Sequence, residues 1–222
     1  MATARGILFR LCYQLRSHRW NGWPLDLWLS LALVLVAGLA SLGLVPGRRA
    51  TIYGMAAALL LLRGLVVWAR RSQYVVFLAE DLPASPGPAA PLLPTDRVEL
   101  RATGGFEVEG KEQQFSDLQA YFRTFATREH AVMAIVPPSR FLLLGTRPEE
   151  EVGMWYIFFQ PQQILALDPG TLCFGPGARS ALRVAYQEEE KQRTVYLSFD
   201  DHTNRQRIWA GLESSAPQAT PR

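Results

Sequence analysis

Two long apolar runs dominate the first third of the chain. Residues 24–45 carry a single charge, Asp26, and residues 52–69 carry a single charge, Arg63. As helices, these runs are about 33 Å and about 27 Å long, which is close to the roughly 30 Å thickness of a bilayer's hydrocarbon core. Only a short turn separates them. The pattern therefore predicts a transmembrane helical hairpin over residues 24–71.

A cleavable secretory signal is the alternative interpretation of the first run, because residues 38–40 resemble a small-residue cleavage site. However, the leading region is 23 residues long, and the apolar run continues beyond Ala40. A second apolar run also follows at once. These lengths favour an uncleaved span.

The basic residues around the two runs predict their orientation. Six arginines lie in the flanks outside the hairpin, against two, Arg48 and Arg49, in the turn between the runs. Because cytoplasmic flanks are enriched in Lys and Arg, both termini should be cytoplasmic, in a two-pass protein of the cell (inner or plasma) membrane. The expected anchors at the cytoplasmic interface are aromatic and basic: Trp20, Trp23, Trp28, Trp68, Arg70 and Arg71.

Arg63 lies about 10 Å inside the cytoplasmic end of the second run. A charged side chain at that depth contacts a partner helix or a lipid headgroup, or its long stem extends to the interface. The reading in which the long stem extends to the interface is favoured. A third reading pairs it with Asp26, although a hairpin register centred on residues 46–49 sets Asp26 nearer Arg70 than Arg63.

The segment 1–23 precedes the hairpin and is both basic and apolar. It is expected to form an amphipathic helix at the membrane surface or, as an alternative, a solvated basic tail. Asn21-Gly22 should end such a helix before the first span. Its apolar positions are Ile7, Leu8, Leu11 and Leu15, and its basic positions include Arg5, Arg10 and Arg16.

A proline-rich linker over 72–94 follows the hairpin. Residues 72–80 are expected to extend the second helix, and five prolines in 81–95 then exclude a helix or a central strand. The linker predicts a boundary before a domain over 95–214, which is long enough for one core. Residues 215–222 should form a disordered tail.

The domain has mostly the alternating pattern of strands. Alternation over 98–102 should stop at a Gly104-Gly105 turn, and Ser116 should cap a helix over 117–127. Strands are then expected at 130–136, 141–145, 154–160, 163–167, 171–174, 181–187 and 193–199, with turns at 168–170 and 175–177 and a last helix at 203–212.

Seven short strands followed by a helix that carries Trp209 resemble the pleckstrin-homology-like fold, a strongly bent barrel closed at one end by a helix. The arrangement as a whole is similar to small bacterial membrane proteins that join a transmembrane hairpin to such a domain. The expected class is therefore an α+β membrane protein with a mostly-β, pleckstrin-homology-like cytoplasmic barrel. Residues 98–127 are either an extension of that plan or a sign that the strands are miscounted, and a generic α+β domain or another small barrel is the alternative.

The charge distribution narrows the choice of partners. The net charge of +3 and the pI near 9.1 combine a net +8 over residues 1–79, a net −2 over 80–94 and a net −3 over 95–222. The basic pI thus belongs to the membrane segment and gives no support for nucleic-acid binding. In the pleckstrin-homology domains that this domain resembles, lipid-binding basic residues lie in the first loop between strands. The matching loop here is 137–140, and Arg140 is its single basic residue. Phosphoinositide binding is therefore not supported.

Candidate reactive residues are sparse and scattered. Cys12 and Cys173 form no recognisable motif, and the runs Glu149–Glu151 and Glu188–Glu190 lack the spacing of a calcium loop. Gly175-Pro176-Gly177 fits a structural turn better than a phosphate-binding loop. His130 lies beside Glu129, and residues 200–203 are best read as the cap of the last helix. No catalytic, cofactor or metal residue is expected.

These observations favour a non-enzymatic, membrane-anchored interaction or scaffold module whose protein partners are unidentified. The alternative is an accessory or assembly subunit of a larger membrane complex, in which Arg63 and small residues of the spans contact partner helices. An enzyme with dispersed active-site residues is the third reading.

Overall fold

The computed structural model describes residues 2–45, 47–80, 90–108, 111–124, 131–137, 152–188 and 190–213. The chain divides into two compact units. The first comprises Met1–Val76 with Phe174–Pro176, and the second comprises Phe77–Cys173 with Gly177–Arg222. The described residues form four α-helices, a small two-stranded ribbon and an eight-stranded sheet, which makes the protein an α+β protein.

The first unit is built on three helices, α1 (Ala2–Ser17), α2 (Leu25–Ser41) and α3 (Arg48–Arg71). Between α1 and α2 lies a ribbon of β1 (Arg19–Trp20) and β2 (Trp23–Pro24). Its turn is Asn21-Gly22, and both residues have positive φ, 52° and 81°. This conformation matches the two-residue hairpin that Asn-Gly favours. Helix α1 already ends at Ser17, before this turn and before α2.

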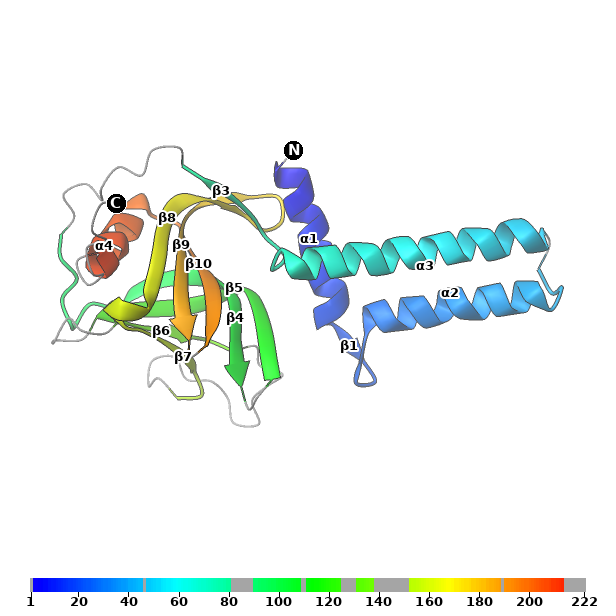
Figure 1. Cartoon of the computed structure of the whole chain (residues 1–222), viewed down its shortest axis with the longest axis horizontal. Coiled ribbons are helices and arrows are strands. Elements are labelled where there is room, and N and C mark those ends of the chain that lie inside the picture. The colour runs from blue at the N-terminus through cyan, green and yellow to red at the C-terminus, as the bar shows by residue number, and fades with distance from the viewer. Residues whose placement is uncertain are drawn as a thin grey trace. The chain divides into compact units, whose positions relative to one another are not determined.

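Helices α2 and α3 run antiparallel, and α1 crosses them at the end of the hairpin where α3 finishes (Figure 1). Among the described helices, α3 alone is long and apolar enough to cross a membrane, judged by its length and composition. Its 24 residues span about 36 Å. The 17 residues of α2 span about 26 Å and end at Ser41, before the predicted limit at residue 45.

A sharp corner follows α3, so the predicted helical extension over 72–80 is wrong. Gln73 and Tyr74 have φ values of 52° and 62°, in the left-handed region. The Tyr74 amide nevertheless donates to the carbonyl of Ala69 at 2.8 Å, which closes the helix end. The chain then enters strand β3 (Val76–Ala79).

The sheet has the strand order β3-β8-β9-β10-β4-β5-β6-β7, and it is strongly curved (Figure 1). Each strand from β4 to β7, and from β8 to β10, pairs antiparallel with the next along the chain. The pairing of β10 with β4 joins the two groups. The strands are β4 (Val98–Val108), β5 (Lys111–Thr124), β6 (Ala131–Ile135), β7 (Trp155–Phe159), β8 (Ile164–Cys173), β9 (Ala178–Glu188) and β10 (Lys191–Phe199).

The helix predicted over 117–127 is instead part of strand β5, and residues 125–127 lie outside the described residues. Strand β5 pairs with β4 on one side and β6 on the other. A β-bulge at Ser116-Asp117 faces the single residue Thr103, and Asp117 has a φ of 55°. The bulge shifts the buried face, so Phe115 on one side of it and Phe122 on the other both point inward with a spacing that imitates a helix.

Two predicted turns are also absent, because β4 runs through Gly104-Gly105 and β8 runs through residues 168–170. Close packing against the backbone of neighbouring strands explains why Gly104 and Gly170 occur within strands. A Cβ at Gly104 would lie 3.0 Å from the carbonyl oxygen of Thr194 on β10. A Cβ at Gly170 would collide with the Leu78 carbonyl on β3. By contrast, residues 175–177 do turn the chain between β8 and β9.

The core of the second unit lies inside the curved sheet and under α4 (His202–Glu213), which confirms the predicted C-terminal helix. Ile208, Trp209 and Leu212 of α4 are buried there. Between Ala131 and Phe199 the described residues form five strands rather than seven, and the strand expected at 141–145 lies outside them. The tail 215–222 is also outside the described residues.

Part of the range predicted as a linker packs against the sheet unit. Strand β3 pairs with β8 and forms one edge of the sheet. At its end, Glu80 accepts a hydrogen bond of 2.5 Å from the buried Arg205 of α4. Further along, Asp96 forms an ion pair with Arg207, and Leu92 packs against the core. These contacts hold α4 from two sides.

Candidate membrane-interface site

An ion cluster joins the three helices of the first unit. Asp26, in the first turn of α2, is completely buried. One of its carboxylate oxygens, Oδ2, lies 3.2 Å from the Nη1 atom of Arg16 on α1 and 3.3 Å from the Nη1 atom of Arg63 on α3. We call Arg16, Asp26 and Arg63 the arginine-aspartate triad.

The position of Arg63 opposite Asp26 follows from the helix ends. Asp26 lies 15 residues before Ser41, the end of α2, and Arg63 lies 15 residues after Arg48, the start of α3. In an antiparallel pair these two positions are level with one another. Of the three readings of Arg63 from the sequence, the pairing with Asp26, which was the least favoured, is the one observed.

The triad is unbalanced in charge. Two guanidinium groups share one carboxylate, which leaves an excess of one positive charge. The side chains of Arg16 and Arg63 are each 41% exposed, whereas Asp26 is not exposed at all. Within the described residues, Asp26 is the partner of both arginines, and each uses Nη1. Among the described residues, no hydrogen bond from the other guanidinium N–H groups is found.

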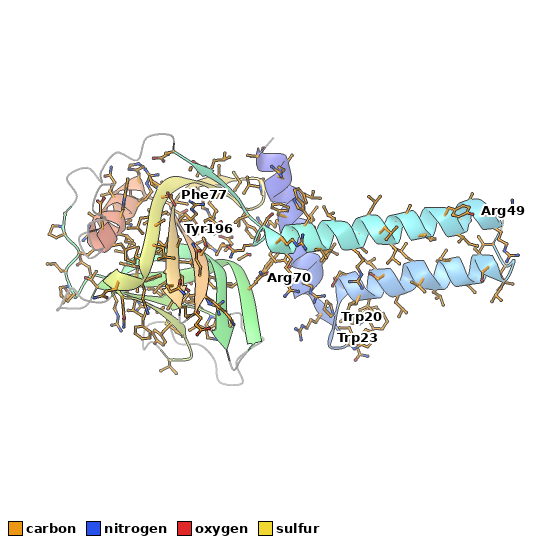
Figure 2. The ribbon with its side chains drawn as sticks, in the orientation of Figure 1. Trp20, Trp23, Arg49, Arg70, Phe77 and Tyr196 are labelled. Carbon is orange, nitrogen blue, oxygen red and sulfur yellow. The ribbon has the colours of Figure 1, made fainter. Side chains whose placement is uncertain are left out.

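The predicted aromatic anchors gather at the same end of the hairpin. The Trp28 indole N–H donates to the Trp20 carbonyl at 2.9 Å, and the Trp28 ring lies 5.3 Å from Trp20 and 6.1 Å from Trp23. Figure 2 shows Trp20, Trp23 and Arg70 at this end, with Arg49 at the opposite end of α3. Trp68, close to Arg70 and Arg71 at the end of α3, meets Phe9 of α1 at 4.7 Å.

Helix α1 has two apolar faces. One packs against α3 through Phe9 and Cys12, which are both 1% exposed. The other carries Ile7 and Leu11, which are 44% and 51% exposed. Of the predicted apolar stripe, Ile7 and Leu11 remain on the surface and Leu8 and Leu15 are half-buried. Phe9 and Cys12, which the stripe did not include, make the contact with α3.

The two cysteines are both buried. Burial raises the pKa of the Cys12 thiol and of the Cys173 thiol, which disfavours the reactive thiolate. Neither residue therefore has the exposed, electropositive surroundings that an activated nucleophile needs.

In the second unit, the other candidate residues have structural contacts. Asp201 accepts a hydrogen bond from the Thr203 amide at 2.9 Å, which confirms the predicted cap of the last helix. The His202 ring nitrogen Nε2 lies 2.6 Å from Arg205, and Glu188 pairs with Arg193. No group of three His, Cys, Asp or Glu residues able to hold a metal ion occurs in the described part of the chain. Residue 130 and the run 149–151 lie outside it.

Comparison with known proteins assigns no family to the chain and no role to these residues. No known protein family, no curated protein and no solved structure matches the chain.

Proposed function

We propose that this protein is a non-enzymatic interaction module that is anchored in the cell membrane by two passes and has both termini in the cytoplasm. The observation that carries the proposal is the direct continuation of an exposed apolar helix into a sheet. Helix α3 ends at Arg71 and strand β3 begins at Val76, so the connecting chain spans at most about 18 Å. A domain on such a tether stays close to the membrane that holds the helix.

The exposed faces of the hairpin support the two-pass arrangement. Leu31 and Leu35 of α2 and Leu60 and Leu61 of α3 are between 51% and 74% exposed. An apolar surface of this kind is unusual in water and is expected in lipid. The 17 residues of α2 lie at the lower limit for a span.

The sheet unit supports the proposed pleckstrin-homology-like domain. Seven consecutive strands, β4 to β10, precede α4, whose Ile208 and Trp209 enter the core. This is the strand count of a bent barrel closed by a helix, and it includes β4 and β5, which the sequence analysis left undecided. Such a domain, without an assigned reaction, presents a surface to partner proteins.

The membrane arrangement is tested on the full chain with a reporter fused to each end. Carbonate extraction should leave the protein in the membrane fraction. Reporters active only in the cytoplasm should work at both ends. Extraction by carbonate, or a reporter active outside the cytoplasm at one end, would overturn the two-pass proposal.

The interaction role is tested by chemical cross-linking in intact membranes followed by purification of the full chain. Specific protein adducts should be recovered with the complete chain and be lost with a variant that retains the hairpin and lacks residues 95–222. The same adducts with both proteins would show that the sheet unit does not recruit partners.

The accessory-subunit alternative has one observation in its favour. A Cβ at Gly38, Gly54 or Gly64 would meet nothing within 4 Å. These glycines are therefore not required for contact between α2 and α3, and they leave space for another helix. Native electrophoresis in mild detergent distinguishes this alternative, which predicts a band much larger than the 24.9 kDa chain.

A further inference from the structure

The arginine-aspartate triad has a charge that its own members do not neutralise. Asp26 offers one negative charge to Arg16 and Arg63, and each arginine approaches it through a single nitrogen at 3.2–3.4 Å. Each guanidinium has five N–H donors in a planar fork that fits an oxyanion with two bonds. The triad therefore has both the spare donors and the net charge to bind an anion.

The surroundings of the triad select the kind of anion. Asp26 lies in the first turn of α2, at the end of the hairpin where Figure 2 shows Trp20, Trp23 and Arg70. Such aromatic and basic residues are typical of headgroup depth. One helical turn further into the hairpin, Leu29 on α2 and Leu60 on α3 are 45% and 74% exposed. Residues three apart on a helix share a face, so these leucines adjoin Asp26 and Arg63.

We propose that Arg16 and Arg63 together bind the phosphate of an anionic phospholipid, whose acyl chain lies along Leu29 and Leu60. The proposal rests on the membrane anchoring proposed above. Asp26 competes for the two guanidinium groups and limits the charge of the triad to +1, which matches in magnitude the single negative charge of a phosphodiester. A net-anionic lipid should therefore bind better than a zwitterionic lipid, whose ammonium group cancels its phosphate charge.

The test uses the full chain in mild detergent and native mass spectrometry with added phosphatidylglycerol, phosphatidylcholine or inorganic phosphate. The unmodified protein should retain phosphatidylglycerol in preference to phosphatidylcholine. Arg16→Gln and Arg63→Gln should each weaken phosphatidylglycerol binding about tenfold, because one charge-assisted hydrogen bond contributes about that much. The matched control is Arg49→Gln, which removes the same charge from the other end of α3 and should bind the lipid as the unmodified protein does.

A purely structural triad predicts a different pattern. Asp26→Asn removes the competing carboxylate, so it should bind phosphatidylglycerol at least as tightly as the unmodified protein, whereas a structural role alone gives no change in lipid selectivity in any variant. Arg63→Lys keeps the charge without the planar fork and should give intermediate binding. Circular dichroism of each variant shows whether the helices remain, and lipid affinities are compared among variants that keep the same helical signal.

Three results would overturn the proposal: equal retention of the two lipids, unchanged binding by both glutamine variants, or displacement of the lipid by inorganic phosphate at equal concentration. The last result would assign the triad to a free anion. Carbonate extraction of the same variants separates this outcome from failure of the anchoring. A protein that stays in the membrane without lipid selectivity refutes the lipid site alone, and a protein that is extracted refutes the anchoring.

Discussion

The hydroxyl of Tyr186 is buried without a hydrogen bond, and its removal gives a sharp test of the sheet unit. Tyr186 lies on β9, is 2% exposed and meets the Phe159 ring edge-on at 5.4 Å. Its hydroxyl has no hydrogen-bond partner within the described residues. Burial raises the pKa of Tyr186 above its ordinary value of 10.0, Glu188 raises it further, and Arg193 opposes the change.

The direction of this pKa shift determines how the stability of the folded protein changes with pH. Above pH 10 the tyrosine of the unfolded chain loses its proton, whereas Tyr186 in the folded chain keeps it. The folded state then holds more protons than the unfolded state, so stability falls as the pH rises, at about 1.4 kcal/mol per pH unit once the unfolded group is ionised. Below pH 10 the contribution is constant.

Tyr186→Phe should therefore be at least as stable as the unmodified protein at pH 7, with a gain of about 1 kcal/mol from loss of an unsatisfied buried hydroxyl. Between pH 10 and 11 it should lose less stability than the unmodified protein by up to about 1.4 kcal/mol. Denaturant unfolding of the full chain in detergent at a series of pH values measures both quantities. Tyr156→Phe, on β7, controls for loss of a less buried hydroxyl. Parallel pH profiles for Tyr186→Phe and the unmodified protein would refute the reasoning.

Three further substitutions test the packing of the sheet unit. Gly170→Ala should lower the free energy of unfolding by about 1–3 kcal/mol and make β3 sensitive to protease, because the added methyl group collides with that strand. Gly177→Ala is its control, since a methyl group there meets nothing within 4 Å. Ile208→Ala should cost about 2–5 kcal/mol in denaturant unfolding, and a loss below about 1 kcal/mol would contradict its burial between α4 and the sheet. Thr103→Val should cost about 1–3 kcal/mol because the Asp117 amide loses its acceptor at 2.9 Å, whereas Thr103→Ser should restore most of the stability.

Some elements could be predicted from the sequence because their signals are local. The apolar runs, the Asn21-Gly22 turn and the cap at Asp201 depend on residues within a few positions of one another. Strand β5 could not be predicted in this way. Its pattern is governed by the bulge opposite Thr103, which lies in the pairing of β5 with β4 and so depends on another strand.

For a related reason, the pairing of Asp26 with Arg63 was one reading of the sequence but not the favoured one, and the contact of Arg16 was not predicted. Pairing Asp26 with Arg63 requires the true ends of α2 and α3, and an error of a few residues in the turn moves the opposite position by a full helical turn. The contribution of Arg16 depends on α1 packing through Phe9 and Cys12, a face that the apolar stripe of Ile7 and Leu11 obscures. Asp26 and Arg63 lie at the same number of residues from the hairpin turn, counted from the ends of α2 and α3. This equality could have predicted the pair.

The left-handed corner after α3 has a practical consequence for dividing the protein. Tyr74 is 3% exposed among the helices of the first unit, and two residues later Val76 begins a strand of the sheet. A fragment of the helices that ends before Tyr74 loses a buried aromatic ring, and a fragment of the sheet that starts after Ala79 loses the edge strand β3. A fragment of the sheet unit should therefore start at Val75, which keeps β3 whole and leaves Tyr74 with the helices.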